Sequence, residues 1–234
     1  MGPAAGSGFS PGEAWGYAWR VVTKKFGAVA VPIAVGSIVL SIPIGIVYGV
    51  MTVGMQIAAE QGLIDLDLIQ LVSAVMGLAV YAVSIFAGAF MLGGITTVAL
   101  KACRGQPTSV GDVFSGGKYM GTMLVAYIVL TIAVVIGMVL CVIPGYILAF
   151  GLALFAPIIV DQGLGGVDAL KKSWAMTKGH KLSIFLFYLI GIFVMLAGYI
   201  ACAVGALLVS LPMMYVGLAY IYLRIKGEQV VEPA

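Results

Sequence analysis

Residues 182–223 read LSIFLFYLIGIFVMLAGYIACAVGALLVSLPMMYVGLAYIYL, a run of 42 positions without a charged side chain. A second run of the same length, residues 119–160, is equally uncharged. One charged side chain at the centre of a bilayer costs roughly 2.5–3.5 kcal/mol on insertion scales, so these runs indicate that lipid is the solvent. A transmembrane helix needs roughly 20 apolar residues. Each run therefore predicts two spans joined by a tight turn.

Prolines and glycines indicate where the two runs turn. The first run turns at Pro144-Gly145, which gives spans near 119–142 and 145–160, and the second turns near Gly205. Earlier in the chain, residues 27–53 and 68–100 supply one further span each. The sequence thus predicts six spans. The expected helix breaks are Pro43, Pro144, Gly145 and Pro212.

The overall composition agrees with a membrane protein. The chain is 62% hydrophobic and 9% charged, with a mean hydropathy of +1.16, whereas a soluble domain carries roughly a quarter charged residues. The net charge of +3 is too small and too scattered for nucleic-acid binding. We therefore expect an all-α, polytopic helical bundle that forms a single membrane domain over residues 1–234.

The charged loops predict the orientation. In a six-span layout every base falls on one side of the membrane: Arg20, Lys24, Lys25, Lys101, Arg104, Lys118, Lys171, Lys172, Lys178, Lys181, Arg224 and Lys226. The loop 54–67 lies on the opposite side and carries three acids and no base. Because cytoplasmic loops are enriched in Lys and Arg, both termini are predicted to be cytoplasmic. Four or five spans would scatter the bases over both faces.

Three cytoplasmic segments share one pattern for starting a helix. Ser10, Ser109 and Gly165 each stand where an N-cap is expected, and an acid follows three residues later. Amphipathic residues come next, and then an apolar span. We interpret these segments as interfacial helices that open three units. The units cover residues 10–100 (interfacial helix 10–26, spans 27–100), 109–160 and 165–225, and either repeat origin or convergence explains their likeness.

The tryptophans and bases of these segments form the candidate lipid site. Indole rings favour the headgroup level, so the simplest interpretation is a set of anchors that fix depth and tilt. The alternative is an anionic-lipid headgroup site, formed where the bases of the first and third segments meet. The residues concerned are Trp15, Trp19, Arg20, Lys24, Lys25, Lys171, Lys172, Trp174, Lys178, His180 and Lys181.

Small residues in the first two spans indicate close helix packing. The glycines expected to pack helices are Gly45, Gly49, Gly77, Gly88 and Gly93. They serve either the bundle itself or a contact with a partner protein or second copy, and the sequence does not separate these.

The third predicted interfacial helix has two distinct faces. Its outer face carries Asp168 and lysines, and its apolar face carries Val167, Leu170 and Trp174.

Signs of catalysis or ion coupling are weak. The predicted spans contain no ionisable Asp, Glu, Lys, Arg or His, which argues against an ion-coupled pump. His180 lacks a nearby Cys or carboxylate partner, so no metal site is expected. Asp161 and Asp168 are interpreted as helix caps. We expect neither enzymatic activity nor a cofactor.

The C-terminal half carries a family resemblance. The residues responsible are Pro144-Gly145, the stretch APIIVDQG at 156–163, DALKKSW at 168–174 and TKGH at 177–180. They resemble a broad prokaryotic group of multi-span proteins that includes the membrane domain attached to some glycerophosphodiester phosphodiesterases. The resemblance implies a bundle of about six helices in a bacterial inner membrane. It implies no reaction, because the phosphodiesterase chemistry belongs to a separate soluble domain.

Two functions from different classes remain open. The leading one is a non-enzymatic scaffold or accessory subunit of the inner membrane, which binds a partner protein or a second copy of itself, organises lipid, or does both. The alternative is a transporter or permease component for an apolar or lipid-like substrate, with a broken-helix site at Pro43 and Pro212. That alternative needs a polar cavity at mid-membrane.

Overall fold

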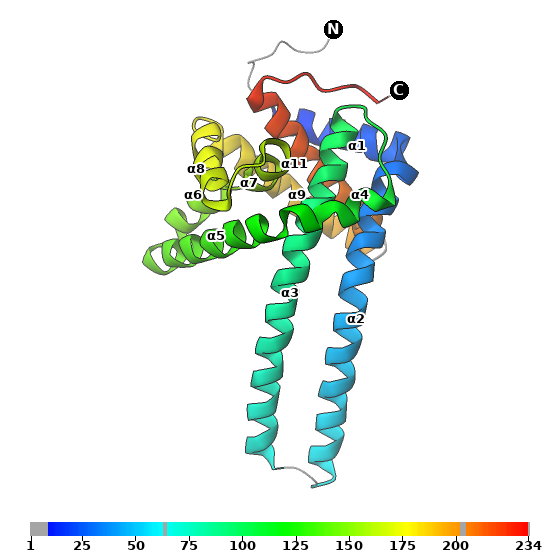
Figure 1. Ribbon diagram of the computed structural model, residues 1–234, viewed down its shortest axis with the longest axis vertical. Helices are drawn as coiled ribbons and strands as arrows, with labels where there is room; N and C mark the ends of the chain where they lie inside the picture. The colour runs from blue at the N-terminus through cyan, green and yellow to red at the C-terminus, as the bar shows by residue number, and fades with distance from the viewer. Residues whose placement is uncertain (1–8, 63–64, 202–204, 234) are drawn as a thin grey trace. The chain divides into compact units, whose positions relative to one another are not determined.

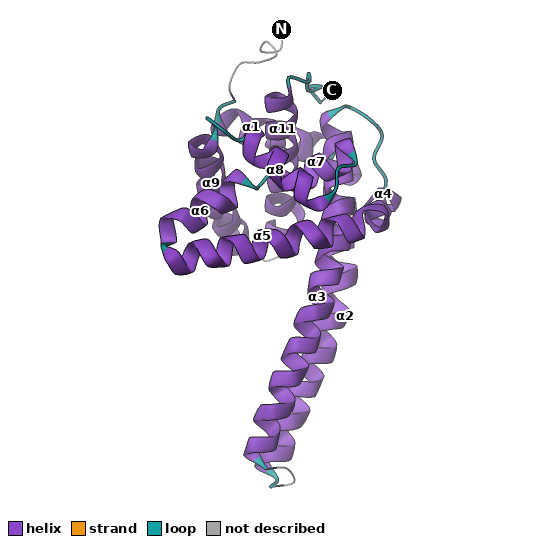
Figure 2. Cartoon of the chain, turned by 60° about the vertical axis from the view of Figure 1, so that its left-hand side comes forward, coloured by secondary structure: helices purple, strands orange, loops and turns teal. Residues whose placement is uncertain are grey.

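The structure is a computed structural model that describes residues 9–62, 65–201 and 205–233. Every regular element in these ranges is a helix (Figures 1 and 2). The elements are α1 (Pro11–Lys24), α2 (Phe26–Glu60), α3 (Leu66–Cys103), α4 (Val110–Phe114), η1 (Ser115–Tyr119), α5 (Met120–Leu140), α6 (Val142–Gly151), α7 (Phe155–Gln162), α8 (Gly166–Met176), α9 (Lys181–Ala201), η2 (Ala206–Ser210) and α11 (Leu211–Lys226). The predicted all-α class is confirmed.

Six helical stretches of the described chain are long and apolar enough to cross a membrane. They are Phe26–Glu60, Asp67–Cys103, Val110–Leu140, Val142–Gln162, Lys181–Ile200 and Leu208–Lys226. The predicted count of six is confirmed, because long uncharged runs are strong signals for membrane helices.

The chain packs as two compact units. The hairpin unit comprises Ser37–Gly88, and the main unit comprises Met1–Gly36 together with Ala89–Ala234. The boundaries cut through α2 and α3, so each of these helices belongs to both units. The expectation of a single membrane domain stays a prediction.

Within the hairpin unit, the last part of α2 and the first part of α3 run side by side (Figures 1 and 2). The helix α2 ends at Glu60, and Gly62 follows with a φ of 67°. Glycine is the residue that adopts this left-handed conformation at little cost, which makes it the usual helix terminator. Three acids, Glu60, Asp65 and Asp67, lie at this end of the unit.

The proline predicted to break α2 does not do so. Pro43 lies inside α2, which continues as one helix to Glu60. A proline removes one backbone donor, and membrane helices tolerate this loss. At Pro32, which also lies in α2, the structure shows one form of compensation. The freed acceptor is the carbonyl of Ala28, four residues earlier, and the Thr108 hydroxyl donates to it.

The turn between α5 and α6 also differs from its prediction. The chain turns at Cys141, whose backbone is extended, and Pro144 and Gly145 lie in the first turn of α6. Proline fits there because first-turn N–H groups have no helical partner. Gly145 instead permits close packing. A Cβ at Gly145 would lie 2.5 Å from Met138 Cγ, and one at Gly137 would lie 2.9 Å from Gly145 Cα.

Pro212 does mark an irregularity. The π-helical segment η2 ends at Ser210, and Pro212 is the second residue of α11. A π-turn is a common consequence where a helical hydrogen bond is missing. The predicted turn near Gly205 adjoins residues 202–204, which lie outside the described residues.

The core of the main unit is formed by contacts between distant helices and between consecutive ones. The helix α1 packs on α11 and α9, α5 pairs with α6, and α7 packs on α8 (Figure 1). The short α7 is buried over most of its length, from Phe155 to Ile159. The three interfacial segments begin their helices as predicted, with Ser10, Ser109 and Gly165 at the N-caps. Ser10 and Glu13 form a full capping box.

Candidate functional site

The helix α8 is fixed to the main unit by its small residues. Gly166, Ala169, Leu170 and Ser173 are buried. A Cβ at Gly166 would lie 2.7 Å from the Thr122 carbonyl oxygen, so the backbones of α8 and α5 are in direct contact. The buried stripe is therefore centred on small residues, while Val167 and Trp174 of the predicted apolar face are exposed on the protein, and the contact of that face with a membrane stays a prediction.

Two hydroxyl groups hold α8 against the break between α6 and α7. Ser173 and Thr177 both donate to the Gly151 carbonyl, at 3.1 and 2.8 Å. Ser173 Oγ also accepts from the Leu154 N–H at 3.1 Å. The break leaves these backbone groups without helical partners, and burying them unpaired would cost about 1–3 kcal/mol each. Their pairing explains why the buried stripe of α8 contains hydroxyls.

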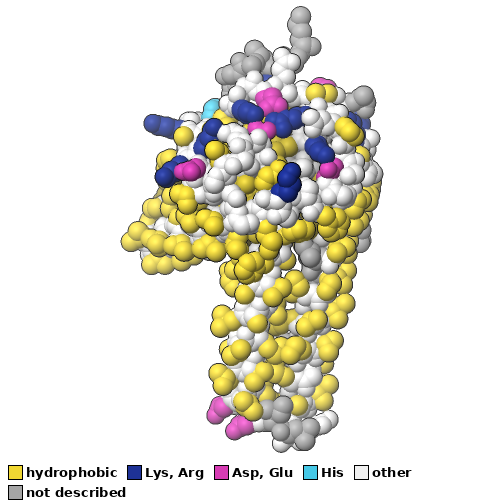
Figure 3. All heavy atoms as spheres, viewed as in Figure 1, with side chains coloured by type: hydrophobic (Ala, Val, Ile, Leu, Met, Phe, Trp, Pro, Cys, Tyr) yellow, Lys and Arg dark blue, Asp and Glu magenta, His cyan; other side chains and the backbone are white. Residues whose placement is uncertain are grey.

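The outer face of α8 carries the bases. Lys171, Lys172 and Lys178 are exposed. The ammonium of Lys171 lies 4.0 Å from the Asp168 carboxylate, and Lys172 donates to the Gln162 side chain. Among the described residues, Lys178 has no ion-pair partner. In Figure 3, Lys and Arg side chains gather at one end of the main unit, and hydrophobic side chains dominate at its opposite edge.

Trp174 and Lys181 form a pair beside this face. The Lys181 ammonium lies 3.0 Å from the centroid of the Trp174 ring, a cation–π contact. Gly151 supplies the space, because a Cβ there would lie 2.5 Å from the indole. The indole and its cation are thus placed together at the edge of α8.

The bases of α1 lie apart from those of α8. The ring of Phe9, before the start of α1, lies 5.8 Å from the His180 ring. At the other end of α1, Arg20 pairs with Glu232 and Lys24 donates to the Pro233 carbonyl. A helix of 14 residues is about 21 Å long. The structure therefore places His180 near the start of α1 and places Arg20 and Lys24 toward its other end, which Lys25 follows. The combined headgroup site stays a prediction.

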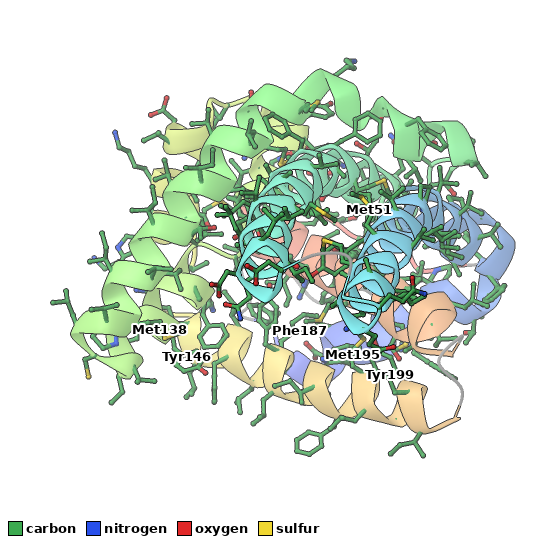
Figure 4. The ribbon with its side chains drawn as sticks, turned by 90° about the horizontal axis from the view of Figure 1, so that it is seen from below. Met51, Met138, Tyr146, Phe187, Met195 and Tyr199 are labelled. Carbon is green, nitrogen blue, oxygen red and sulfur yellow. The ribbon has the colours of Figure 1, made fainter. Side chains whose placement is uncertain are left out.

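The three tryptophans lie in different surroundings. Trp15 is 6% exposed, stacks on Phe187 with ring centroids 5.0 Å apart, and donates from Nε1 to the Phe187 carbonyl at 3.0 Å. Trp19 is 54% exposed and Trp174 is 38% exposed. Trp15 is thus a core residue that joins α1 to α9. Figure 4 labels Phe187, Met195 and Tyr199, which follow one another along α9.

A charged network that the sequence did not predict joins α3, α7 and α11. The Asp161 carboxylate is only 7% exposed and has three partners: Arg104 at 2.5 Å, Lys226 at 2.6 Å and the Tyr222 hydroxyl at 2.6 Å. Arg104 also bonds Glu228 at 2.6 Å. Asp161 was interpreted as a helix cap. One signal was available: Asp161 and Lys226 stand just beyond the ends of two long apolar runs, where charges meet at one membrane surface.

Electrostatics in this region follow from the pairing. The hydrogen bond from Arg104 holds the pKa of Glu228 below its usual range. The bond to Glu228 in turn raises the pKa of the Arg104 guanidinium. Burial raises the pKa of Tyr17, whose hydroxyl donates to the Val231 carbonyl. These groups are therefore held in single charge states at neutral pH.

The predicted packing glycines fall into two groups. Gly93 lies in the main unit, where a Cβ would be 3.2 Å from Gly116 Cα. Its neighbour Gly94 is tighter still, with the Val113 carbonyl oxygen 1.7 Å from such a Cβ. Within the hairpin unit a Cβ at any of the other four would have no heavy atom within 4 Å; these are Gly45, Gly49, Gly77 and Gly88. The two helices of the hairpin thus leave these positions uncovered.

The described residues contain no group of three or more His, Cys, Asp or Glu that could hold a metal ion. Cys103 is buried and Cys141 is exposed at the α5–α6 turn. Met138 and Tyr146 flank this turn on the two helices (Figure 4).

The fold and the distribution of charge define the class: a multi-pass helical membrane protein. Residues 119–231 match a family described as a domain of unknown function (DUF7847). The chain is 27% identical over 238 residues to the uncharacterized protein Rv2560 of Mycobacterium tuberculosis, and equally to the uncharacterized protein Mb2590 of Mycobacterium bovis. Each alignment covers 97% of this chain and 71% of the relative.

No solved structure matches the chain. The resemblance to the membrane domain of glycerophosphodiester phosphodiesterases stays a prediction.

Proposed function

We propose that this protein is a non-enzymatic scaffold or accessory subunit of a bacterial inner membrane. In this proposal both termini are cytoplasmic, and the outer face of α8 attracts anionic lipid and thereby holds a partner protein or a second copy near the membrane. The observation that carries the proposal is that α8 is held against the main unit by its buried face, while the lysines on its exposed side have few acidic partners.

The first support is the contrast between the two faces of α8. Its inner face is fixed by two hydroxyls on the Gly151 carbonyl, its outer face presents Lys171 to solvent, and Lys178 is exposed in the turn that follows α8. The Lys171–Asp168 pair is long and exposed, and such surface pairs contribute little. Clustered bases beside a membrane attract anionic lipid by about 1 kcal/mol per residue. Because α8 is docked, its backbone is already in place and only the lysine side chains lose freedom when they bind.

The second support is the use of the carboxylates. Glu13 caps α1, Asp112 caps α4 and pairs with Lys101, and Asp161 and Glu228 belong to the charged network. A general acid or base needs a carboxyl group that is free to exchange protons near a substrate. These four acids are instead held in structural contacts, which favours a non-enzymatic function.

The test is the retention of anionic lipid and of associated protein. We expect the K171Q/K178Q variant to bind phosphatidylglycerol roughly 30-fold more weakly than the native chain, from about 1 kcal/mol per lysine. Native mass spectrometry of the protein taken from mixed phosphatidylglycerol and phosphatidylcholine measures this directly. Any protein that co-purifies in mild detergent should be lost in parallel.

Two controls separate charge from general damage. K171R/K178R retains both charges and should behave as the native chain. K118Q removes an exposed lysine from a different element, η1, and should leave retention unchanged. Equal phosphatidylglycerol retention by K171Q/K178Q and the native chain would contradict the proposal.

The transporter alternative has one specific observation in its favour. The helix irregularity at η2 and Pro212 is present, and the Ser210 hydroxyl lies beside it, donating to the Val194 carbonyl. Pro43, the other predicted break, lies in a continuous helix. Substrate-dependent flux through proteoliposomes that Ser210→Ala abolishes would favour this alternative over the scaffold.

A further inference from the structure

We propose that the segment Gly227–Pro233, here called the strap, occupies a phosphate-binding face of α1, and that the phosphate group of an anionic phospholipid displaces it. This site is separate from the outer face of α8. The strap would then act as an internal competitor that keeps the face closed until anionic lipid is present.

The donors stand on one face of α1. Tyr17, Arg20 and Lys24 are spaced three and four residues apart, which places them on one side of a helix. The Tyr17 hydroxyl, the Arg20 guanidinium and the Lys24 ammonium are all hydrogen-bond donors at neutral pH. Two of the three are cations. Such a set suits a ligand that is both anionic and rich in acceptor oxygens.

The strap supplies oxygen acceptors to each of these donors. Tyr17 donates to the Val231 carbonyl at 2.8 Å, and Lys24 donates to the Pro233 carbonyl at 3.2 Å. Arg20 bonds both oxygens of Glu232, at 3.2 and 3.3 Å. Three consecutive residues thus present one carboxylate and two carbonyl oxygens to one helix face. A phosphodiester offers the same combination of negative charge and oxygens, and the guanidinium fork fits phosphate as well as carboxylate.

The far end of the strap is held by a small set of contacts, in which the ion pair is exposed and Pro233 is buried. The Arg20 and Glu232 side chains are 49% and 67% exposed, and ion pairs of this kind contribute little to stability. The Val231 N–H bonds the Cys103 carbonyl at 3.0 Å, and this is the backbone contact that ties the far end to α3. Segments held by few exposed contacts open most readily.

The near end of the strap is held firmly. Gly227 ends α11 in the left-handed conformation, and Glu228 bonds Arg104 within the charged network. Release of Val231–Pro233 therefore leaves Gly227 and Glu228 in place. The strap can open without disturbing Asp161.

The surroundings of the face suit the headgroup level. Trp19, next to Arg20, is exposed, and so is Phe26, just beyond Lys24. Aromatic rings beside cations are typical of the membrane interface. A phosphate at Arg20 would therefore have acyl chains and apolar rings within reach, which favours a lipid over a soluble phosphate.

Hydrogen exchange of the strap tests the proposal. The full chain is placed in nanodiscs of phosphatidylcholine alone and in nanodiscs that also contain phosphatidylglycerol. We expect about fivefold faster exchange of the Val231 amide with phosphatidylglycerol, as for the loss of a surface ion pair and its hydrogen bonds. Inorganic phosphate added to phosphatidylcholine nanodiscs should leave the exchange unchanged. An equal acceleration there would show that the face binds free phosphate and would overturn the assignment of a lipid as the ligand.

Variants separate the strap from the outer face of α8. E232Q weakens the competitor, so the strap should exchange faster in both nanodiscs and the protein should retain more phosphatidylglycerol. R20Q/K24Q should abolish the difference between the nanodiscs. K171Q/K178Q should preserve that difference even if it lowers total lipid retention, so failure here and failure of the proposed function are distinguishable. Equal exchange of the native strap in both nanodiscs would overturn the proposal.

Discussion

Replacement of Asp161 by Asn should destabilise the protein far more than the same replacement at Asp168. Asp161 is 7% exposed and accepts from Arg104, Lys226 and Tyr222. Removing one partner of a buried charge pair costs about 3–5 kcal/mol. Arg104 keeps its bond to Glu228, and Asn still accepts one hydrogen bond, so we expect about 3 kcal/mol.

Asp168 provides the matched control. Its side chain is 71% exposed and its ion pair with Lys171 is 4.0 Å long, so D168N should cost less than about 0.5 kcal/mol. Both variants are unfolded in mixed detergent micelles with increasing SDS, and the free energies of unfolding are compared. A double variant with R104Q should show a coupling of about 1–3 kcal/mol. If D161N and D168N unfold at the same SDS fraction, the network contributes nothing and the reasoning fails.

Three further predictions follow from burial, close packing and charge. Trp15→Ala should lower the free energy of unfolding by about 3–5 kcal/mol, whereas the exposed Trp19→Ala should change it by less than about 0.5 kcal/mol. Gly94→Ala places a Cβ 1.7 Å from the Val113 carbonyl oxygen and should reduce the yield of folded protein, while Gly45→Ala, where no atom lies within 4 Å, should not. The pKa of Glu228 is lowered in the folded state, so its contribution is present above about pH 4.3 and is lost as the pH falls through the folded pKa. E228Q should therefore lose less stability on acidification, as thermal unfolding at a series of pH values would measure.

The membrane spans and the starts of the helices were predictable because their signals are local. In lipid, an uncharged run of 42 residues must pair its own backbone groups, and few structures other than helices allow this. The capping box of Ser10 and Glu13 is complete within four residues, and the structure reproduces it. Where the physical cause lies within one helix, the sequence was sufficient.

Features that depend on distant residues were not predictable. Asp161 meets Arg104 and Lys226 across separations of 57 and 65 residues. The sequence places these charges at one membrane surface, but no local pattern shows which of them pair. Trp15 was expected at an interface because it stands in an amphipathic helix, yet α9 covers it. The turn was predicted at Pro144-Gly145 and not at Cys141, because a Pro-Gly pair can mark a turn but also suits a first helical turn with a close contact.

Both proposals depend on the predicted membrane topology, and measuring that topology is the most direct test of the account. Single cysteines are placed in a cysteine-free background and labelled with a membrane-impermeant maleimide. One replaces Gln61, beside the hairpin tip, and the other replaces Ala175, an exposed residue of α8. With cytoplasmic basic loops, Gln61→Cys should react from outside intact spheroplasts, and Ala175→Cys should react only after the membrane is opened. Labelling of Ala175→Cys from outside, with Gln61→Cys reachable only from within, would contradict the account.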